Sequence, residues 1–338
     1  MTSTPTVHPI ERPPAPAART LRGEGGRRFL EAYRVEAAML GALVLLCIAL
    51  SLLTSTFLSA GNLRNVAWQV TAIGIIAIGQ TLVMLTGGID LSVGGIVAFS
   101  AMVGGLLMTG AGDNVALGLG VTLAVGLLVG LANGLIVAYG RLAAFIVTLG
   151  MSSIAYSLTY VLSDASSIVG LPPGYRVWGR GSLGPIPLYT VTFVVLFVVG
   201  HVLLTRTKPG RFFYAIGSNE EAARLSGVNV RAIKALPYAI TGLLCAVAAL
   251  VLSGRLGAID PDTGTGFELD SIAAVVIGGT SLFGGKGSLV GTVIGVFLIG
   301  ILNNGLNLLR VNAFWQGTAV GVVIILSVLV ERLSRRRA

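Results

Sequence analysis

The sequence predicts an all-α, polytopic integral membrane protein with about ten transmembrane helices and both termini in the cytoplasm. Of its 338 residues, 54% are hydrophobic and only 11% are charged, more apolar side chains than a soluble domain of this length can bury. Glycine occurs 47 times, roughly double its usual share, which favours helices that pack closely. Basic residues gather in the tails and at the ends of apolar runs, as the positive-inside rule requires.

The first 35 residues are rich in Pro, Ala and Arg and show no apolar period, so residues 1–35 are expected to form a disordered basic cytoplasmic tail. This polar lead is too long for a signal peptide, and many apolar segments follow it, so we expect the first apolar stretch to be an anchor. Residues 36–334 are expected to form the transmembrane domain, and residues 335–338 a short basic C-terminal tail.

Apolar stretches of about 20 residues predict the individual spans. The expected spans are 36–56, 67–87, 92–110, 114–139, 142–163, 187–205, 232–253, 270–284, 288–308 and 314–332. Ten crossings return the chain to its starting side, where a second basic cluster contains Arg332, Arg335, Arg336 and Arg337. This topology places Arg64, Arg176, Arg180, Arg255 and Arg310 at the outer side, so these five depart from the rule.

A glycine-rich motif with one carboxylate lies between the second and third expected spans. Its residues Gly87, Gly88, Asp90, Ser92 and Gly94 are expected to act as a hinge or cap, with the Asp90 carboxylate as N-cap accepting from the amide of Ser92 or Val93. A simpler alternative is that the motif only begins a span at the cytoplasmic interface. A third is coupling of proton or cation movement to Asp90, which would require further acids within the spans.

Five uncharged polar residues are embedded in apolar runs: Gln80, Asn133, Asn303, Asn304 and Asn307. Their amides can replace water around a polar solute, so they are candidates for a translocation path. They can equally link helices through hydrogen bonds. Cys47 and Cys245 lie within apolar runs and are interpreted as packing residues, and no metal site is predicted.

The loop at 206–231 contains the signature of a short surface helix. Ser218 or Asn219 can cap its start, acids occupy its first turn, and Gly227 suits the position after its end. The residues of this helix and its caps are Asn219, Glu220, Glu221, Ala222, Ala223, Arg224, Leu225, Ser226 and Gly227. From these residues alone, a solvated amphipathic turn on the inner membrane surface is an equally good interpretation.

Five segments in a characteristic order give the chain a family resemblance. They are GGIDLSVGG at 87–95, ANGLIV at 132–137, FIVTLGM at 145–151, AIGSNEEAARLSGV at 215–228 and AAVVIGGTSLFGGKGSLVGT at 273–292. With them, the chain resembles the ribose, xylose and galactoside permeases of the ATP-binding-cassette (ABC) superfamily. The segments extend over most of the chain beyond the tail.

The resemblance implies a permease of the bacterial cytoplasmic membrane that pairs with a second copy and contacts lipid. It implies that residues 219–227 engage a separate cytoplasmic ATPase, which binds ATP and Mg²⁺. It also implies that an extracytoplasmic solute-binding protein delivers a sugar or related solute. The outer loops 164–186 and 254–269 are the expected docking surfaces for that donor.

No cofactor site and no catalytic site are expected in the chain itself. The phosphate-loop pattern GxxxxGK[ST] is absent, because Gly284-Gly285-Lys286-Gly287-Ser288 lacks the required spacing. A stand-alone ion-coupled carrier, an ABC permease for an amino acid, and a membrane enzyme are the alternatives. Nucleic-acid binding is not expected, because the basic residues do not form one patch interleaved with aromatic side chains.

Overall fold

The computed structural model describes residues 34–312, 315–318, 320–322, 325 and 329. Contacts within the chain separate Met1–Val35 from Glu36–Ala338, and the arrangement below is that of the second unit. The expected tail at 1–35 lies almost wholly outside the described residues. So do most of the tenth expected span and the basic cluster at its end, including Arg332, Arg335, Arg336 and Arg337.

Long apolar helices dominate the fold, and the described residues contain eight that are long and apolar enough to cross a membrane. They are α2 (Arg34–Leu53), α3 (Ala60–Leu85), α4 (Val93–Gly110), α5 (Val115–Gly140), α6 (Ala144–Ser163), α8 (Leu188–Arg206), α11 (Val230–Leu256) and α13 (Leu289–Leu308). Each overlaps an expected span. The prediction of an all-α polytopic membrane protein is therefore confirmed, although the described residues do not reproduce a count of ten.

The remaining elements are short. They are the helices α7 (Pro173–Arg180), α9 (Lys208–Ser218), α10 (Glu220–Leu225) and α12 (Phe267–Ile277), and the two-residue strands β1 (Ile168–Val169), β2 (Ser182–Leu183), β3 (Ile186–Pro187) and β4 (Ala258–Ile259). They occupy the connections between the long helices.

The expected span at 270–284 is not one continuous helix. Helix α12 has only 11 residues, about 16 Å at 1.5 Å per residue, about half the thickness of the hydrocarbon core. It ends at a glycine pair in which Gly279 has a φ of 80°, and Gly284 and Gly285 also have positive φ values of 84° and 74°. These glycines support an irregular chain between α12 and α13 that a continuous helix cannot contain.

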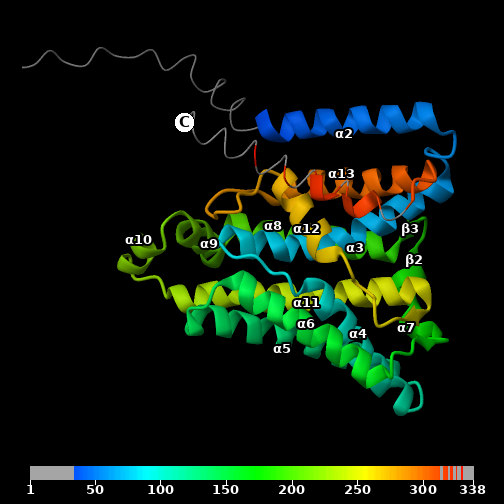
Figure 1. Ribbon diagram of the computed structural model, residues 1–338, viewed down its shortest axis with the longest axis horizontal. Coiled ribbons are helices and arrows are strands. Elements are labelled where there is room, and N and C mark those ends of the chain that lie inside the picture. Colours follow the sequence, from blue (N-terminus) through cyan, green and yellow to red (C-terminus); the bar gives the residue numbers. More distant parts are fainter. Residues whose placement is uncertain (1–33, 313–314, 319, 323–324, 326–328, 330–338) are drawn as a thin grey trace, which may run out of the picture. The chain divides into compact units, whose positions relative to one another are not determined.

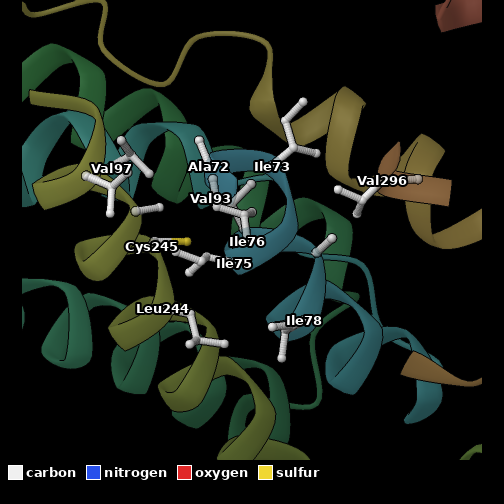
Figure 2. Packing of buried hydrophobic residues seen from close by; sticks show 14 of the residues in the cluster. Ala72, Ile73, Ile75, Ile76, Ile78, Val93, Val97, Leu244, Cys245 and Val296 are labelled. Carbon is white, nitrogen blue, oxygen red and sulfur yellow. The ribbon is translucent and has the colours of Figure 1, made fainter. Parts of the chain in front are cut away.

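The hydrophobic core is built around α3 and α11, whose side chains are buried along most of their length. Figure 2 shows Ile75 and Ile76 of α3 beside Val93 of α4 and Leu244 and Cys245 of α11. Cys245 is fully buried as a free thiol, and Cys47 is free and partly buried. By contrast, α8 exposes Val194, Val195, Val198 and Val199, an apolar face suited to lipid.

Small residues allow α5 and α11 to approach closely. A Cβ atom built on Gly130 would lie 2.8 Å from the Cα of Gly242, and one built on Gly126 would lie 2.5 Å from the Gly242 carbonyl oxygen. Only hydrogen fits at these positions. This contact explains part of the glycine enrichment of the sequence.

Apart from α12, the short elements lie at the two ends of the long helices (Figure 1). Helices α9 and α10 lie where α11 begins, and we call this the α10 end. Helix α7 and the strands lie where α11 finishes, and we call this the α7 end. There β1 pairs with β4 through Ile168 and Ile259, so the expected loops 164–186 and 254–269 are joined in one small sheet.

Candidate functional site

Helix α10 is short and capped at both ends. The side chain of Asn219 accepts a hydrogen bond of 2.9 Å from the amide of Ala222 at the N-terminus. At the C-terminus Gly227 has a φ of 81°, and the amide of Val228 donates to the Ala223 carbonyl over 3.2 Å. The short helix expected at 219–227 is therefore present, with Asn219 rather than Ser218 as its N-cap.

Two ion pairs hold α10 in place. The Arg224 guanidinium lies 2.5 Å from Glu221, and the Lys234 ammonium lies 2.9 Å from Glu220, which ties α10 to the start of α11. Hydrogen bonds from Arg224 lower the pKa of Glu221 and, reciprocally, raise the pKa of Arg224. Because both side chains are exposed, this pair orders the helix surface more than it stabilises the whole protein.

Helix α10 has one attached face and one free face. Ala223 is buried beside Ile216 and Val230, which anchors the helix to its neighbours. On the free face Leu225 is 78% exposed, beside the ion-paired residues. A capped helix that presents an exposed leucine is well suited to docking into a groove on another protein.

The glycine-rich motif forms an irregular segment between α3 and α4 rather than a cap alone. Asp90 accepts from the amide of Ser92 over 2.9 Å and from its hydroxyl over 2.5 Å. However, α4 begins at Val93 and its N-cap position is Ser92, so Asp90 precedes the cap. The expected hydrogen bond from the Ser92 amide to Asp90 is present, but the expectation of Asp90 as N-cap is wrong in position, because α4 begins at Val93 and Ser92 is therefore the N-cap.

Thr148 of α6 binds this segment through hydrogen bonds, a role that sequence reasoning missed. Its hydroxyl accepts from the Leu91 amide over 3.0 Å, and it lies 3.2 Å from the Ile89 carbonyl. The amide of Asn133 donates to the Ser92 hydroxyl over 2.7 Å. The motif therefore joins α4, α5 and α6 through buried hydrogen bonds.

The glycines of the motif allow close packing. Gly87 has a φ of 79°, which favours glycine, and a Cβ on Gly94 would lie 2.5 Å from the carbonyl oxygen of Gly264. Gly88 approaches the hydroxyl of Tyr238 so closely that a Cβ there would collide with it. Helices and loops from distant parts of the chain meet at this segment.

A polar cavity opens at the α7 end, between α3, α11 and α13. It has two adjoining parts, of about 470 Å³ and about 180 Å³, which share Trp68, Gln69 and Asn307. The larger part is also lined by Asn62, Asn65, Arg180, Arg255, Leu256, Asn304 and Leu308, and the smaller part by Ala72, Ile73, Leu252, Phe267, Asp270, Asn303 and Gln316. Its size suits a small organic solute.

The five candidate path residues divide into two groups. Asn303, Asn304 and Asn307 line the cavity, and Asn304 also exchanges hydrogen bonds with Asn62. Asn133 lies with Ser92, and Gln80 is fully buried in α3 with no hydrogen-bond partner among the described residues. Sequence reasoning missed three lining residues, Trp68, Gln69 and Asp270. They lie near the ends of expected spans, whereas the candidate path residues were sought inside apolar runs.

Apolar helices around a polar cavity, with an exposed capped helix at the opposite end, define a multi-pass membrane permease. Residues 62–328 match the family described as the permease component of branched-chain amino acid transport systems. The chain belongs to this family of permeases, and it is a multi-pass protein of the cytoplasmic membrane. No solved structure matches the chain.

Curated relatives cover most of the chain. The ribose import permease protein of Bacillus subtilis is 47% identical over 293 residues, covering 86% of this chain and 90% of the relative. The ribose import permease protein of Escherichia coli K12 is 42% identical over 311 residues, covering 91% and 97%. The D-allose transport system permease protein of E. coli K12 is 36% identical over 283 residues, covering 84% and 87%.

Proposed function

We propose that this chain is the membrane-spanning permease subunit of an ABC importer that carries a sugar or related small polar solute into the cytoplasm. The relatives named for ribose and D-allose import support the solute class. The structural observation that carries the proposal is α10, a capped and ion-paired helix with an exposed leucine. A capped helix exposed at this end is available for docking, and in this proposal its partner is a separate ATPase.

The energy source in this proposal is outside the chain. ATP and Mg²⁺ bind to the partner ATPase, and this chain binds no cofactor and has no catalytic site. Closure of the ATPase moves the coupling loop 206–231 and with it the start of α11, to which α10 is tied through Glu220 and Lys234. The movement switches the path between outward and inward access.

The α10 end is the cytoplasmic end in this proposal. The Arg231 guanidinium lies 5.9 Å from the Tyr139 ring centroid, so the turn after α5 and the loop before α11 meet there. Arg141 in that turn and Arg206, Lys208 and Arg211 in or beside the loop make this end basic. Basic loops remain in the cytoplasm, which orients the protein.

The remaining partners follow from this orientation. A solute-binding protein docks at the α7 end, on the surface formed by α7 and the paired strands β1 and β4. A second permease copy completes the transport unit, and lipid covers exposed apolar faces such as that of α8. Nucleic acid is not a partner. A hinge lies at the start of α4, in the segment with Gly87, Gly88, Asp90, Ser92 and Gly94.

The test is reconstitution of the permease with its co-encoded ATPase and binding protein in vesicles. We expect ATP-dependent sugar uptake that needs all three components. Disruptive substitutions at Glu221 and Gly227 should abolish uptake and the coupling of ATP hydrolysis while the permease still inserts. Uptake by the permease alone in an ion gradient would instead identify an ion-coupled carrier. Branched-chain amino acids are the matched competitors, because the family description names them.

A further inference from the structure

The smaller part of the cavity holds unused hydrogen-bonding capacity. Trp68 Nε1 and Asn303 Oδ1 are buried and have no hydrogen-bond partner within the described part of the chain. The Asn303 amide nitrogen is 3.5 Å from Asp270 Oδ2, at the outer limit for a hydrogen bond. Leaving buried polar atoms unpaired is costly, so a polar ligand or water would stabilise this arrangement.

The donors and acceptors surround one small space. The indole N–H of Trp68 is a donor, the Asp270 carboxylate is an acceptor, and the amides of Gln69, Asn303, Asn307 and Gln316 can act as both. Gln316 donates to Asn307 over 2.7 Å, which leaves the amide nitrogen of Asn307 available. Phe267 and Leu252 add apolar walls. Several hydroxyl groups on a compact carbon frame would match this lining.

The charges disfavour an anionic ligand. Asp270 is the one ionisable side chain among the described residues that line the smaller part, and an anionic solute would be repelled there. The two arginines of the larger part already have partners. Arg255 donates to Asn65 over 3.0 Å, and its guanidinium lies 5.7 Å from the Trp68 ring centroid. Arg180 donates to the Arg255 carbonyl over 2.8 Å.

We propose that the smaller cavity is a binding subsite for a neutral monosaccharide on the permease itself, with Trp68, Asp270 and Asn303 as its main hydrogen-bonding groups. This inference rests on the proposed function and specifies where the solute is held after leaving the binding protein. The wider part, lined by amides and the two arginines, is the entry. Binding is weak, because a transport site must release what it takes up.

The direct test follows the fluorescence of Trp68 in the permease alone, in lipid nanodiscs. Substitutions Trp178→Phe and Trp315→Phe leave Trp68 as the single tryptophan. D-ribose, D-allose and D-fructose are the probes, and L-leucine is the matched non-sugar. We expect a saturable change with at least one sugar in the millimolar range and none with leucine.

Variants then locate the subsite. Asn303→Leu should weaken the sugar response about tenfold, since it removes one buried polar partner. Asn307→Leu, at an exposed position that tolerates change, provides a second variant should the first fail to fold. Thr190→Val is the control, because it removes from α8 a buried hydroxyl that has no partner among the described residues, away from the cavity lining.

Asp270→Asn separates the ligand classes. An amide still accepts a hydroxyl hydrogen bond, so the sugar response should fall only a few-fold, whereas binding of an ammonium group would be lost. A saturable response to leucine that Asp270→Asn abolishes would overturn the sugar assignment.

Uptake by the complete importer separates the subsite from the proposed function. One outcome is that the wild-type importer takes up sugar while Trp68 gives no saturable signal and both Asn variants import at the wild-type rate. In that case the subsite is wrong and the proposed function stands. If the wild-type importer takes up no sugar, the proposed function itself is wrong.

Discussion

Asn62 of α3 and Asn304 of α13 are joined by two reciprocal hydrogen bonds, of 3.0 Å and 2.8 Å, although 242 residues separate them in the chain. Both side chains are buried, and Asn62 also donates to the Phe57 carbonyl over 2.9 Å. The pair lies in the lining of the larger cavity. It links the two helices that supply most of the cavity's amides.

Asn304→Leu should destabilise the protein by about 1–3 kcal/mol, because the buried Asn62 amide loses both hydrogen bonds to Asn304 and keeps only the one to Phe57. The double variant Asn62→Leu and Asn304→Leu should recover part of this loss, since both polar groups are then removed. Thermal unfolding of the purified permease in one detergent measures both effects. Strictly additive losses in the double variant would contradict the coupling.

Gly130→Ala should destabilise the contact between α5 and α11 by about 1–3 kcal/mol, because its Cβ would overlap the backbone of α11. Gly120→Ala is the matched control on the same helix, where an added Cβ meets no described atom within 4 Å. Alanine favours helix by about 1 kcal/mol, so the control should be neutral or stabilising. Equal midpoints for the two variants in thermal unfolding would argue against tight packing.

Leu225→Asp should reduce ATP-dependent uptake by at least about tenfold, because a charge would replace the exposed apolar anchor of α10. Leu225→Met, which keeps an apolar side chain, should retain most of the activity. Uptake and co-purification of the ATPase are measured together. Normal uptake by Leu225→Asp would remove Leu225 from the docking surface.

Acid should loosen α10. Arg224 lowers the pKa of Glu221 in the folded protein. The pair therefore stabilises α10 fully above the pKa of glutamate in the unfolded chain, near 4.3. This stabilisation is lost as the pH falls through the lower pKa of Glu221 in the folded protein. Hydrogen exchange of the α10 amides, corrected for the intrinsic rate, should therefore increase below about pH 4 in the wild type. In Glu221→Gln the increase should be smaller, because the pair with Arg224 is already absent, and a wild-type profile in that variant would refute the assignment.

Several features follow from local sequence. Apolar length predicts α5, α8 and α13, because a span of about 20 residues needs no information from elsewhere in the chain. The caps of α10 follow from Asn219 and Gly227, since a side-chain acceptor and a residue with positive φ act within one turn. The composition alone places the chain in a membrane.

Other features depended on the tertiary structure. The replacement of the span at 270–284 by the short helix α12 required the packing that stabilises an irregular chain with positive φ angles. Asn133 and Asn303 look alike in sequence, yet one binds Ser92 and the other faces a cavity. The sequence by itself determined the membrane setting and the caps of α10, because these depend on solvent transfer and neighbouring residues. Only the tertiary structure decided which polar groups meet, because those contacts join residues far apart in the chain.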